Sequence, residues 1–280
     1  MKVKAYAKIN IALDVVGKRN DGYHLLRMIM QNIDLYDDII VDKIDSGITV
    51  SCNKNFVPTD ERNLAYKAAD LFIKTFNIQQ GVSIKIKKNI PVSAGLAGGS
   101  TDCAAVLKAM NKIFNINATD EELMKLGVKL GADVPYCIKG GTALCEGIGE
   151  VLTELPSFKD KIVVLVKPPF AVSTKEVYKK FELNKVRIHP KTEELIKAME
   201  KQDIRFVARN MKNLLENVTL REYEEISNIK YNMRKYGCLG TMMSGSGPSV
   251  FAFFDDMLLA QMCYDNMKKK YKDTFITRTI

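Results

Sequence analysis

The chain has 280 residues, of which 46% are hydrophobic and 27% charged, a balance typical of a soluble globular protein with one large or two ordinary domains. No apolar run is long enough to span a membrane, and Met1 leads directly into a strand pattern without a secretory or transit leader, so we expect a cytoplasmic protein. The net charge of +9 fits a nucleic-acid partner, an anionic small substrate or neither, because the lysines are spread along the chain.

Cysteine and histidine usage argues against several kinds of catalytic site. The six cysteines are scattered and form no Cys-x-x-Cys pair, which favours buried thiols over a metal or disulfide framework. His24 and His189 are the two histidines, so a histidine-rich metal site or a Ser-His-Asp triad is a poor explanation, although His24 alone still suits such a role.

The first strand is predicted over residues 2–16, where apolar and polar residues alternate. Lys8 and Asn10 are two residues apart and therefore share one face of this strand, either as a functional pair or as part of a solvent-facing surface. A turn over residues 17–22 follows. Tyr23 and His24 then open the next strand, where they suit either a base or sugar pocket or ordinary packing.

The middle of the chain reads as a strand, a glycine-rich loop and a helix. Strands are expected over 25–35, 39–41, 48–52 and 82–87, and helices over 62–76 and 100–114. Ser100, Thr101 and Asp102 are N-cap candidates for the second helix. A helix N-terminus with small residues before it attracts phosphate, although a tight strand-to-helix connection is the alternative. The loop matches neither Walker A nor Gly-x-Gly-x-x-Gly.

Asp133 is the most interesting carboxylate of the next segment. Thr119–Glu122 is a capping box that opens a helix, and Gly131 to Pro135 is predicted to end it. Asp133, fixed at that corner among apolar residues, is a candidate base or cation partner. The alternative is an aspartate that merely forms the turn.

The second half of the chain follows a domain boundary expected at Leu155-Pro156-Ser157. It reads as a buried strand (162–167), a helix capped by Ser173-Thr174, and a polar loop (184–189). Further helices and strands are expected over 191–200, 203–216, 220–236, 250–254, 257–270 and 275–280. Ser244 to Pro248 form a second glycine-rich turn, which is either an anion site or a simple hairpin.

Together, the Lys8–Asn10 strand, the central loop and the late glycine-rich turn resemble the GHMP kinase family. The central Pro91-x-x-x-Gly95-Leu96-x-x-Gly99-Ser100-Thr101 is similar to the family's phosphate loop, with Thr101 where serine is usual. Ser93-Ala94 stand where related sequences are often richer in glycine, and both changes keep small groups or a hydroxyl. Within the family the chain is most similar to kinases that act on a cytidine diphosphate ester of methylerythritol. That resemblance covers essentially the full chain and depends on four stretches: Ala7-Lys8-Ile9-Asn10, Arg19-Asn20-Asp21-Gly22-Tyr23-His24, Gly131-Ala132-Asp133-Val134-Pro135 and Met243-Ser244-Gly245-Ser246-Gly247.

The resemblance implies an ATP-dependent kinase, with Mg²⁺ carried mainly by the phosphates and no metal held by the protein. It makes Asp133 the base that takes the proton of the acceptor's 2-hydroxyl. Lys8 beside it would keep the carboxylate ionised and stabilise the transferred phosphoryl group. The implied ATP-binding residues are Pro91, Val92, Ser93, Ala94, Gly95, Leu96, Ala97, Gly98, Gly99, Ser100 and Thr101.

The implied substrate-binding residues are Asn10, Tyr23, His24, Tyr178, Gly245 and Gly247. Tyr23 would stack on cytosine, His24 would hydrogen-bond its polar edge, and Tyr178 would cover the other face. The reaction implied is direct in-line transfer without a phosphoenzyme, in the non-mevalonate isoprenoid route.

The fold implied is α+β in two lobes, with substrate and ATP in the cleft between them. Residues 1–156 would form a ribosomal-S5-domain-2-like lobe for ATP and catalysis, and residues 157–280 a ferredoxin-like lobe for the substrate. We expect a monomer or weak homodimer, with no nucleic-acid or membrane partner.

Two rival functions follow from the same residues. One is another GHMP kinase, acting on homoserine, a mevalonate or a sugar, but only a nucleotide-bearing substrate needs the base pocket that Tyr23 and His24 suggest. The other is a non-catalytic GHMP-fold binding protein or a basic RNA-binding protein. Loss of Lys8 or Asp133 would mark that case, and both are present.

Overall fold

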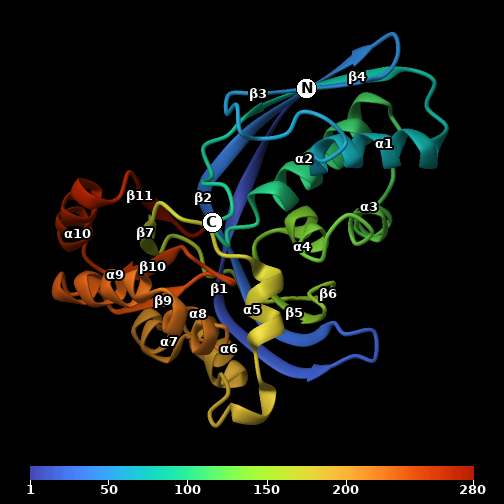
Figure 1. The fold of residues 1–280 in the computed structure, drawn as a ribbon. Coiled ribbons are helices and arrows are strands. Elements are labelled where there is room, and N and C mark those ends of the chain that lie inside the picture. The colour runs from blue at the N-terminus through green and yellow to red at the C-terminus, as the bar shows by residue number, and fades with distance from the viewer. The chain divides into compact units, whose positions relative to one another are not determined.

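The computed structural model describes residues 1–280, and the chain divides into two compact units (Figure 1). The first unit comprises Met1–Ala7, Leu35–Val92 and Ala97–Gly140. The second comprises Lys8–Asp34, Ser93–Leu96 and Gly141–Ile280.

The sheet of the first unit has the strand order β3-β4-β2-β1. Its strands are β1 (Lys2–Lys18), β2 (His24–Ile44), β3 (Ile48–Cys52) and β4 (Gly81–Lys87). β1 and β2 are long strands that contribute their other halves to the second unit. The two short strands predicted at 25–35 and 39–41 are therefore one strand. The expected break at Tyr36-Asp37-Asp38 does not occur, because Asp37 is buried and its side chain accepts hydrogen bonds.

Four helices complete the first unit: α1 (Leu64–Phe76), α2 (Gly98–Ile113), α3 (Asp120–Gly127) and α4 (Val134–Lys139). The capping box predicted for α3 is confirmed, because Thr119 and Glu122 each bond the other's backbone N–H. α4 was not predicted. Pro135 does not end a helix but lies in the first turn of α4, where its missing N–H costs nothing.

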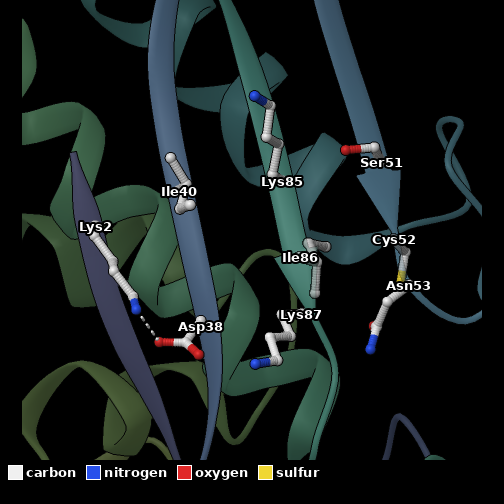
Figure 2. A pocket seen from close by; sticks show the side chains of 9 residues that line it. All are labelled: Lys2, Asp38, Ile40, Ser51, Cys52, Asn53, Lys85, Ile86 and Lys87. Atoms are coloured by element: carbon white, nitrogen blue, oxygen red, sulfur yellow. Dashed lines mark hydrogen bonds and ion pairs between the residues drawn. The ribbon is translucent and has the colours of Figure 1, made fainter.

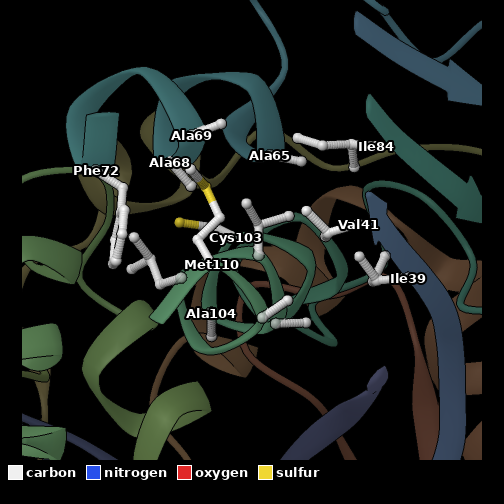
Figure 3. Packing of buried hydrophobic residues seen from close by; sticks show 14 of the residues in the cluster. Ile39, Val41, Ala65, Ala68, Ala69, Phe72, Ile84, Cys103, Ala104 and Met110 are labelled. Atoms are coloured by element: carbon white, nitrogen blue, oxygen red, sulfur yellow. The ribbon is translucent and has the colours of Figure 1, made fainter. Parts of the chain in front are cut away.

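The core of the first unit lies between these helices and the sheet (Figure 3). Alanines on α1 face small and sulfur-containing residues on α2, which allows the two helices to pack closely. Phe72 of α1 is fully buried, and its truncation to alanine would cost about 3–5 kcal/mol of stability. α2 therefore packs on a closely filled core.

The second unit contains a four-stranded antiparallel sheet with the order β11-β7-β10-β9. Its strands are β7 (Ile162–Lys167), β9 (Gly240–Met243), β10 (Val250–Phe254) and β11 (Asp273–Arg278). Three helices contact this sheet: α7 (Ile204–Asn210), α9 (Glu224–Lys235) and α10 (Met257–Lys270). Every residue of β10 is buried, as a central strand with covered faces requires.

The rest of the second unit extends the long strands and adds short helices. β5 (Thr142–Gly147) pairs with β2 and with β6 (Val151–Glu154), and β8 (Lys212–Asn213) pairs in parallel with β1. The short helices are α5 (Thr174–Lys180), η1 (Leu183–Lys185, a 3-10 turn), α6 (Thr192–Glu200) and α8 (Glu216–Glu222). Ser173 caps α5, as predicted.

The helices predicted over 203–216 and 220–236 are partly wrong. The chain leaves the helix after Asn210, forms β8, and resumes as α8 and then α9. Long-range contacts override local helix propensity here, because Leu13 and Asn213 are register partners across β1 and β8. No helix of the structure is both long enough and apolar enough to cross a bilayer.

Candidate functional site

Lys8 and Asn10 are both buried on β1. The two residues are 4% and 0% exposed, and the Lys8 ammonium donates to Asn10 Oδ1 at 2.8 Å. The alternative of a solvent-facing strand is therefore wrong. Burying an ammonium costs free energy unless hydrogen bonds compensate it. Solubility therefore does not explain why Lys8 and Asn10 stand at these positions.

The late glycine-rich turn is hydrogen-bonded to the same strand. The backbone N–H of Gly245 donates to Asn10 Oδ1 at 3.1 Å. Asn213 of β8 supports the turn by donating from Nδ2 to the carbonyl oxygens of Met243 at 2.8 Å and Gly245 at 2.7 Å. Asn213 was missed by sequence reasoning, because it lay inside a predicted helix.

The 93–96 part of the central loop belongs to the same cluster of the second unit. The backbone N–H of Lys8 donates to Leu96 O at 3.2 Å, and Ser244 Oγ donates to Gly95 O at 3.0 Å. Gly95 has a φ of +74°, and a Cβ on it would lie 2.2 Å from Ser244 O. Three stretches that are far apart in sequence therefore meet within one unit.

Within the first unit, the other part of the loop leads into α2. The helix begins at Gly98, two residues before the predicted start, and its N-cap is Ala97 in a left-handed conformation without a side-chain cap. Ser100, Thr101 and Asp102 are therefore inside the helix and not caps. The first N–H groups of an α-helix have no intrahelical partner, and together with the helix dipole they attract phosphate.

Asp133 lies in the first unit at the N-cap position of α4. Its backbone is helical, and its side chain makes no capping hydrogen bond to α4. Gly127 allows α4 to approach α3 closely, because a Cβ on it would lie 2.7 Å from Val134 Cγ1. The packing of α4 on α3 thus positions the backbone of Asp133. Its predicted partnership with Lys8 stays a prediction.

An aromatic group forms around His24 in the second unit. The imidazole lies 5.1 Å from the ring of Tyr178, at 31°, and 6.1 Å from the ring of Phe181, edge to face. Burial, with a smaller contribution from Lys18, lowers the pKa of His24 below its ordinary 6.5, so the ring is neutral at pH ~7. A neutral imidazole donates from one nitrogen and accepts at the other.

Sequence reasoning missed Phe181, the residue that directly follows α5. Tyr23, by contrast, is 61% exposed, and its backbone N–H donates to Asp21 Oδ1 at 3.2 Å.

Gly247 has a φ of +91°, and a Cβ there would lie 2.6 Å from Met243 Sδ. The glycine is required by the shape of the late turn.

A separate depression lies on the sheet of the first unit (Figure 2). Lys2 Nζ lies 2.9 Å from Asp38 Oδ1, and Figure 2 shows this pair with Lys85 and Lys87 on the neighbouring strand. None of the residues predicted for the site lines this depression.

Comparison with known proteins agrees with the motifs. The model of the GHMP kinases N terminal domain matches residues 63–141, and the model of the GHMP kinases C terminal domain matches residues 195–273. These segments lie on either side of the boundary predicted at 156/157. The division into an ATP-binding and a substrate-binding lobe stays a prediction.

Curated relatives and solved structures point the same way. The 4-diphosphocytidyl-2-C-methyl-D-erythritol kinase of Clostridium beijerinckii is 72% identical over 280 residues, with all of both chains covered. That of Clostridium perfringens is 65% identical, covering all of this chain and 98% of the relative. A crystal structure of 4-(cytidine 5'-diphospho)-2C-methyl-D-erythritol kinase matches with a TM-score of 0.85 and 29% identity, covering 100% of this chain and 99% of that one.

A homoserine kinase from Cytophaga hutchinsonii matches with a TM-score of 0.81 at 20% identity over 100% of this chain and 94% of its own, which shows a shared fold. The predicted α+β GHMP kinase fold is confirmed. With such identity over full length, the chain belongs to the GHMP kinases and, within them, to the 4-diphosphocytidyl-2-C-methyl-D-erythritol kinase family.

Proposed function

We propose that the chain transfers the γ-phosphoryl group of ATP directly and in line to the 2-hydroxyl of 4-diphosphocytidyl-2-C-methyl-D-erythritol, without a phosphoenzyme. It is an ATP-dependent kinase of the non-mevalonate isoprenoid route, as its family membership establishes. The observation that carries the proposal is the hydrogen-bonded cluster of Lys8, Asn10 and Gly245 with the Gly95 loop.

Asp133 is the proposed base for the acceptor hydroxyl, and Lys8 stabilises the charge of the phosphoryl group in transfer. Phosphoryl transfer involves little covalent chemistry by the protein, so positioning and charge stabilisation supply most of the catalysis. A buried, oriented ammonium such as that of Lys8 suits this task, because it needs no reorganisation during the reaction.

Residues 91–101 are the proposed triphosphate site. The small residues of this loop and the N-terminal amides of α2 provide N–H groups without crowding the phosphates. Mg²⁺ would accompany ATP and take its ligands mainly from phosphate oxygens and water.

The cytidine end of the substrate is assigned to the aromatic group around His24. Tyr178 and Phe181 provide apolar walls, and a neutral imidazole both donates to and accepts from the polar edge of cytosine. Tyr23 would supply a further stacking surface from the preceding turn. Asn10, Gly245 and Gly247 are the proposed contacts near the acceptor, and we expect a monomer or weak homodimer.

A coupled assay of ADP release with a panel of acceptors tests this function. We expect turnover with the cytidyl diphosphate substrate and background rates with homoserine, mevalonate and free sugars. Turnover of homoserine or mevalonate without turnover of the cytidyl substrate would overturn the substrate assignment. Absence of turnover with every acceptor would favour a binding protein.

A further inference from the structure

A buried ammonium joins both ends of the phosphate loop within the first unit. Lys88 follows β4 directly and is 5% exposed. Its Nζ donates to Asp37 Oδ2 at 2.5 Å, to Asp102 Oδ2 at 2.9 Å and to Gly98 O at 3.2 Å. Gly98 and Asp102 both belong to the start of α2, so one side chain before the loop holds the helix after it.

Asp37 of β2 holds the residues just before the loop by hydrogen bonds in the same way. Its Oδ1 accepts the backbone N–H of Asn89 at 2.6 Å and that of Ile90 at 2.9 Å. The glycine at position 98 belongs to this arrangement, because a Cβ there would lie 3.1 Å from Lys88 Nζ and 3.2 Å from Ile90 Cγ2. The hydrogen bonds of Asp37, on β2, and of Lys88, directly after β4, therefore determine where α2 begins.

The two carboxyl groups of the cluster differ in their hydrogen bonds. Asp37 accepts three donors, which stabilise a negative charge. Asp102 accepts Lys88 on Oδ2, while its Oδ1 is buried without a partner. One ammonium cannot compensate two buried carboxylates. The geometry therefore assigns the charge to Asp37 and a proton to Asp102.

The electrostatics agree with this assignment. Burial raises the pKa of Asp102 to about 8; Lys88 opposes the rise and Asp37 adds to it. Although burial alone would lower it, Asp102 and Asp37 together raise the pKa of Lys88, so the amine stays charged. Cys103 does not titrate in this range, because burial and the neighbouring Asp102 raise its pKa to about 12.

We propose that Asp37, Lys88 and Asp102 form a positioning cluster for the ATP phosphate loop, in which Asp102 carries a proton so that α2 presents no uncompensated negative charge to the triphosphate. This inference rests on the proposed assignment of residues 91–101 to ATP. The three side chains act through the loop and through α2. Ionisation of Asp102 adds a negative charge early in α2, which weakens the attraction of the helix N-terminus for phosphate.

The test compares Asp102→Asn with the wild-type chain and with Asp70→Asn. Asparagine keeps a side-chain oxygen for Lys88 but cannot ionise, and Asp70 is an exposed partner of Lys74 on α1. Calorimetry measures the binding of magnesium adenylyl imidodiphosphate between pH ~7 and ~9.5. We expect wild type and Asp70→Asn to lose affinity about three- to tenfold across this range, and Asp102→Asn to change little.

A carbon-13 spectrum of labelled aspartate carboxyls gives a readout that does not need ATP. We expect one resonance to titrate near pH ~8 in the wild type and to be missing in Asp102→Asn. In Asp37→Asn, Asp102 pairs alone with Lys88, so both its titration and the fall in nucleotide affinity move to lower pH. An unchanged midpoint in that variant contradicts the cluster.

The two measurements separate the possible failures. If no aspartate titrates above pH ~6 in the wild type, the proton assignment is overturned. If Asp102 titrates as expected but wild type and Asp102→Asn share one pH dependence of nucleotide affinity, the link to the phosphate loop is overturned. If Asp102 titrates but the analogue does not bind at all, the proposed ATP site fails, and the role of the cluster fails with it.

Discussion

The side-chain oxygen of Asn10 accepts the backbone N–H of Gly245 at 3.1 Å, although 235 residues separate the two. The same oxygen accepts the Lys8 ammonium at 2.8 Å. One buried amide thus fixes a proposed catalytic cation and the late loop together. The side chain of Asn10 therefore determines the geometry of both the Lys8–Asn10 strand and the late glycine-rich turn.

Asn10→Ala removes the acceptor that these two donors share. A buried donor that loses its acceptor costs about 1–3 kcal/mol, so we expect a fall of that size in the free energy of unfolding. We also expect kcat/KM for the cytidyl substrate to fall about tenfold or more, because the Lys8 ammonium is no longer held in one place. Urea unfolding and the coupled assay measure the two effects. Asn266→Ala, exposed on α10, should change neither.

Gly95→Ala tests the contact between the two glycine-rich loops. The added Cβ would lie 2.2 Å from Ser244 O at a φ of +74°, so both strain and a backbone clash oppose it. We expect a loss of roughly 1–3 kcal/mol in stability and a rise in the KM for ATP.

Gly141→Ala is a matched control for that substitution. Gly141 also has a φ of +74°, but a Cβ there would meet nothing within 4 Å. The variant should therefore show only the loss of stability that a positive φ causes in alanine, about 1 kcal/mol, and leave the KM for ATP unchanged. Equal losses in the two variants would mean that the contact of Gly95 with Ser244 has no special role.

Local patterns predicted the parts of the fold that depend on local interactions. The Thr119 capping box, the β1 alternation and the glycine motifs were all visible, because a cap, a strand face and a tight turn each need particular residues at fixed spacing. The position of β8 was not visible, because Asn213 gains its hydrogen bonds from residues about thirty positions away. The Lys88 cluster was missed for the same reason.

The aromatic group around His24 shows the same limit. Tyr178 and His24 were predicted from family resemblance, but Phe181 was not, because a phenylalanine after a short helix looks like packing. Its contact with His24 depends on where α5 lies beside β2 within the second unit. Helix starts were also displaced, since Ala97 begins α2 without the polar cap that sequence reasoning looks for.

Tyr23→Ala tests the proposed stacking on cytosine. We expect the KM for the cytidyl substrate to rise about tenfold while the KM for ATP is unchanged, because a stacked base is worth about 1–3 kcal/mol. Tyr231 on α9 is a matched control, since it is 59% exposed against 61% for Tyr23. Tyr231→Ala should have no effect on either KM. Equal losses for both substrates in Tyr23→Ala would contradict stacking.

His24 should make stability depend on pH in mildly acidic solution. Burial lowers its pKa in the folded chain below the unfolded value of 6.5, so the unfolded chain binds protons more readily. The stabilisation is complete above pH 6.5 and is lost as the pH falls through the lower folded pKa. The melting temperatures of wild type and His24→Gln should therefore become more similar as the pH falls. An equal difference between the two melting temperatures at pH ~7.5 and at pH ~5.5 would rule this out.

Asp133→Asn tests the proposed base. Asparagine has nearly the same shape but cannot take a proton, so we expect ATP affinity to stay within about twofold and turnover to fall by about a hundredfold or more. Asp45→Asn, an exposed change in the β2–β3 turn, is the control and should keep full turnover. Near-normal turnover in Asp133→Asn would remove that residue from its role.

The double variant with Lys8→Met shows whether the two residues act in one step. Groups that act as a unit have non-additive effects on the rate. The turnover of the double variant should therefore be only slightly lower than that of the less active single variant. If the two losses multiply, Lys8 and Asp133 contribute independently, and Lys8 must stabilise phosphate charge without depending on the base. Rates measured under single-turnover conditions separate this chemistry from product release.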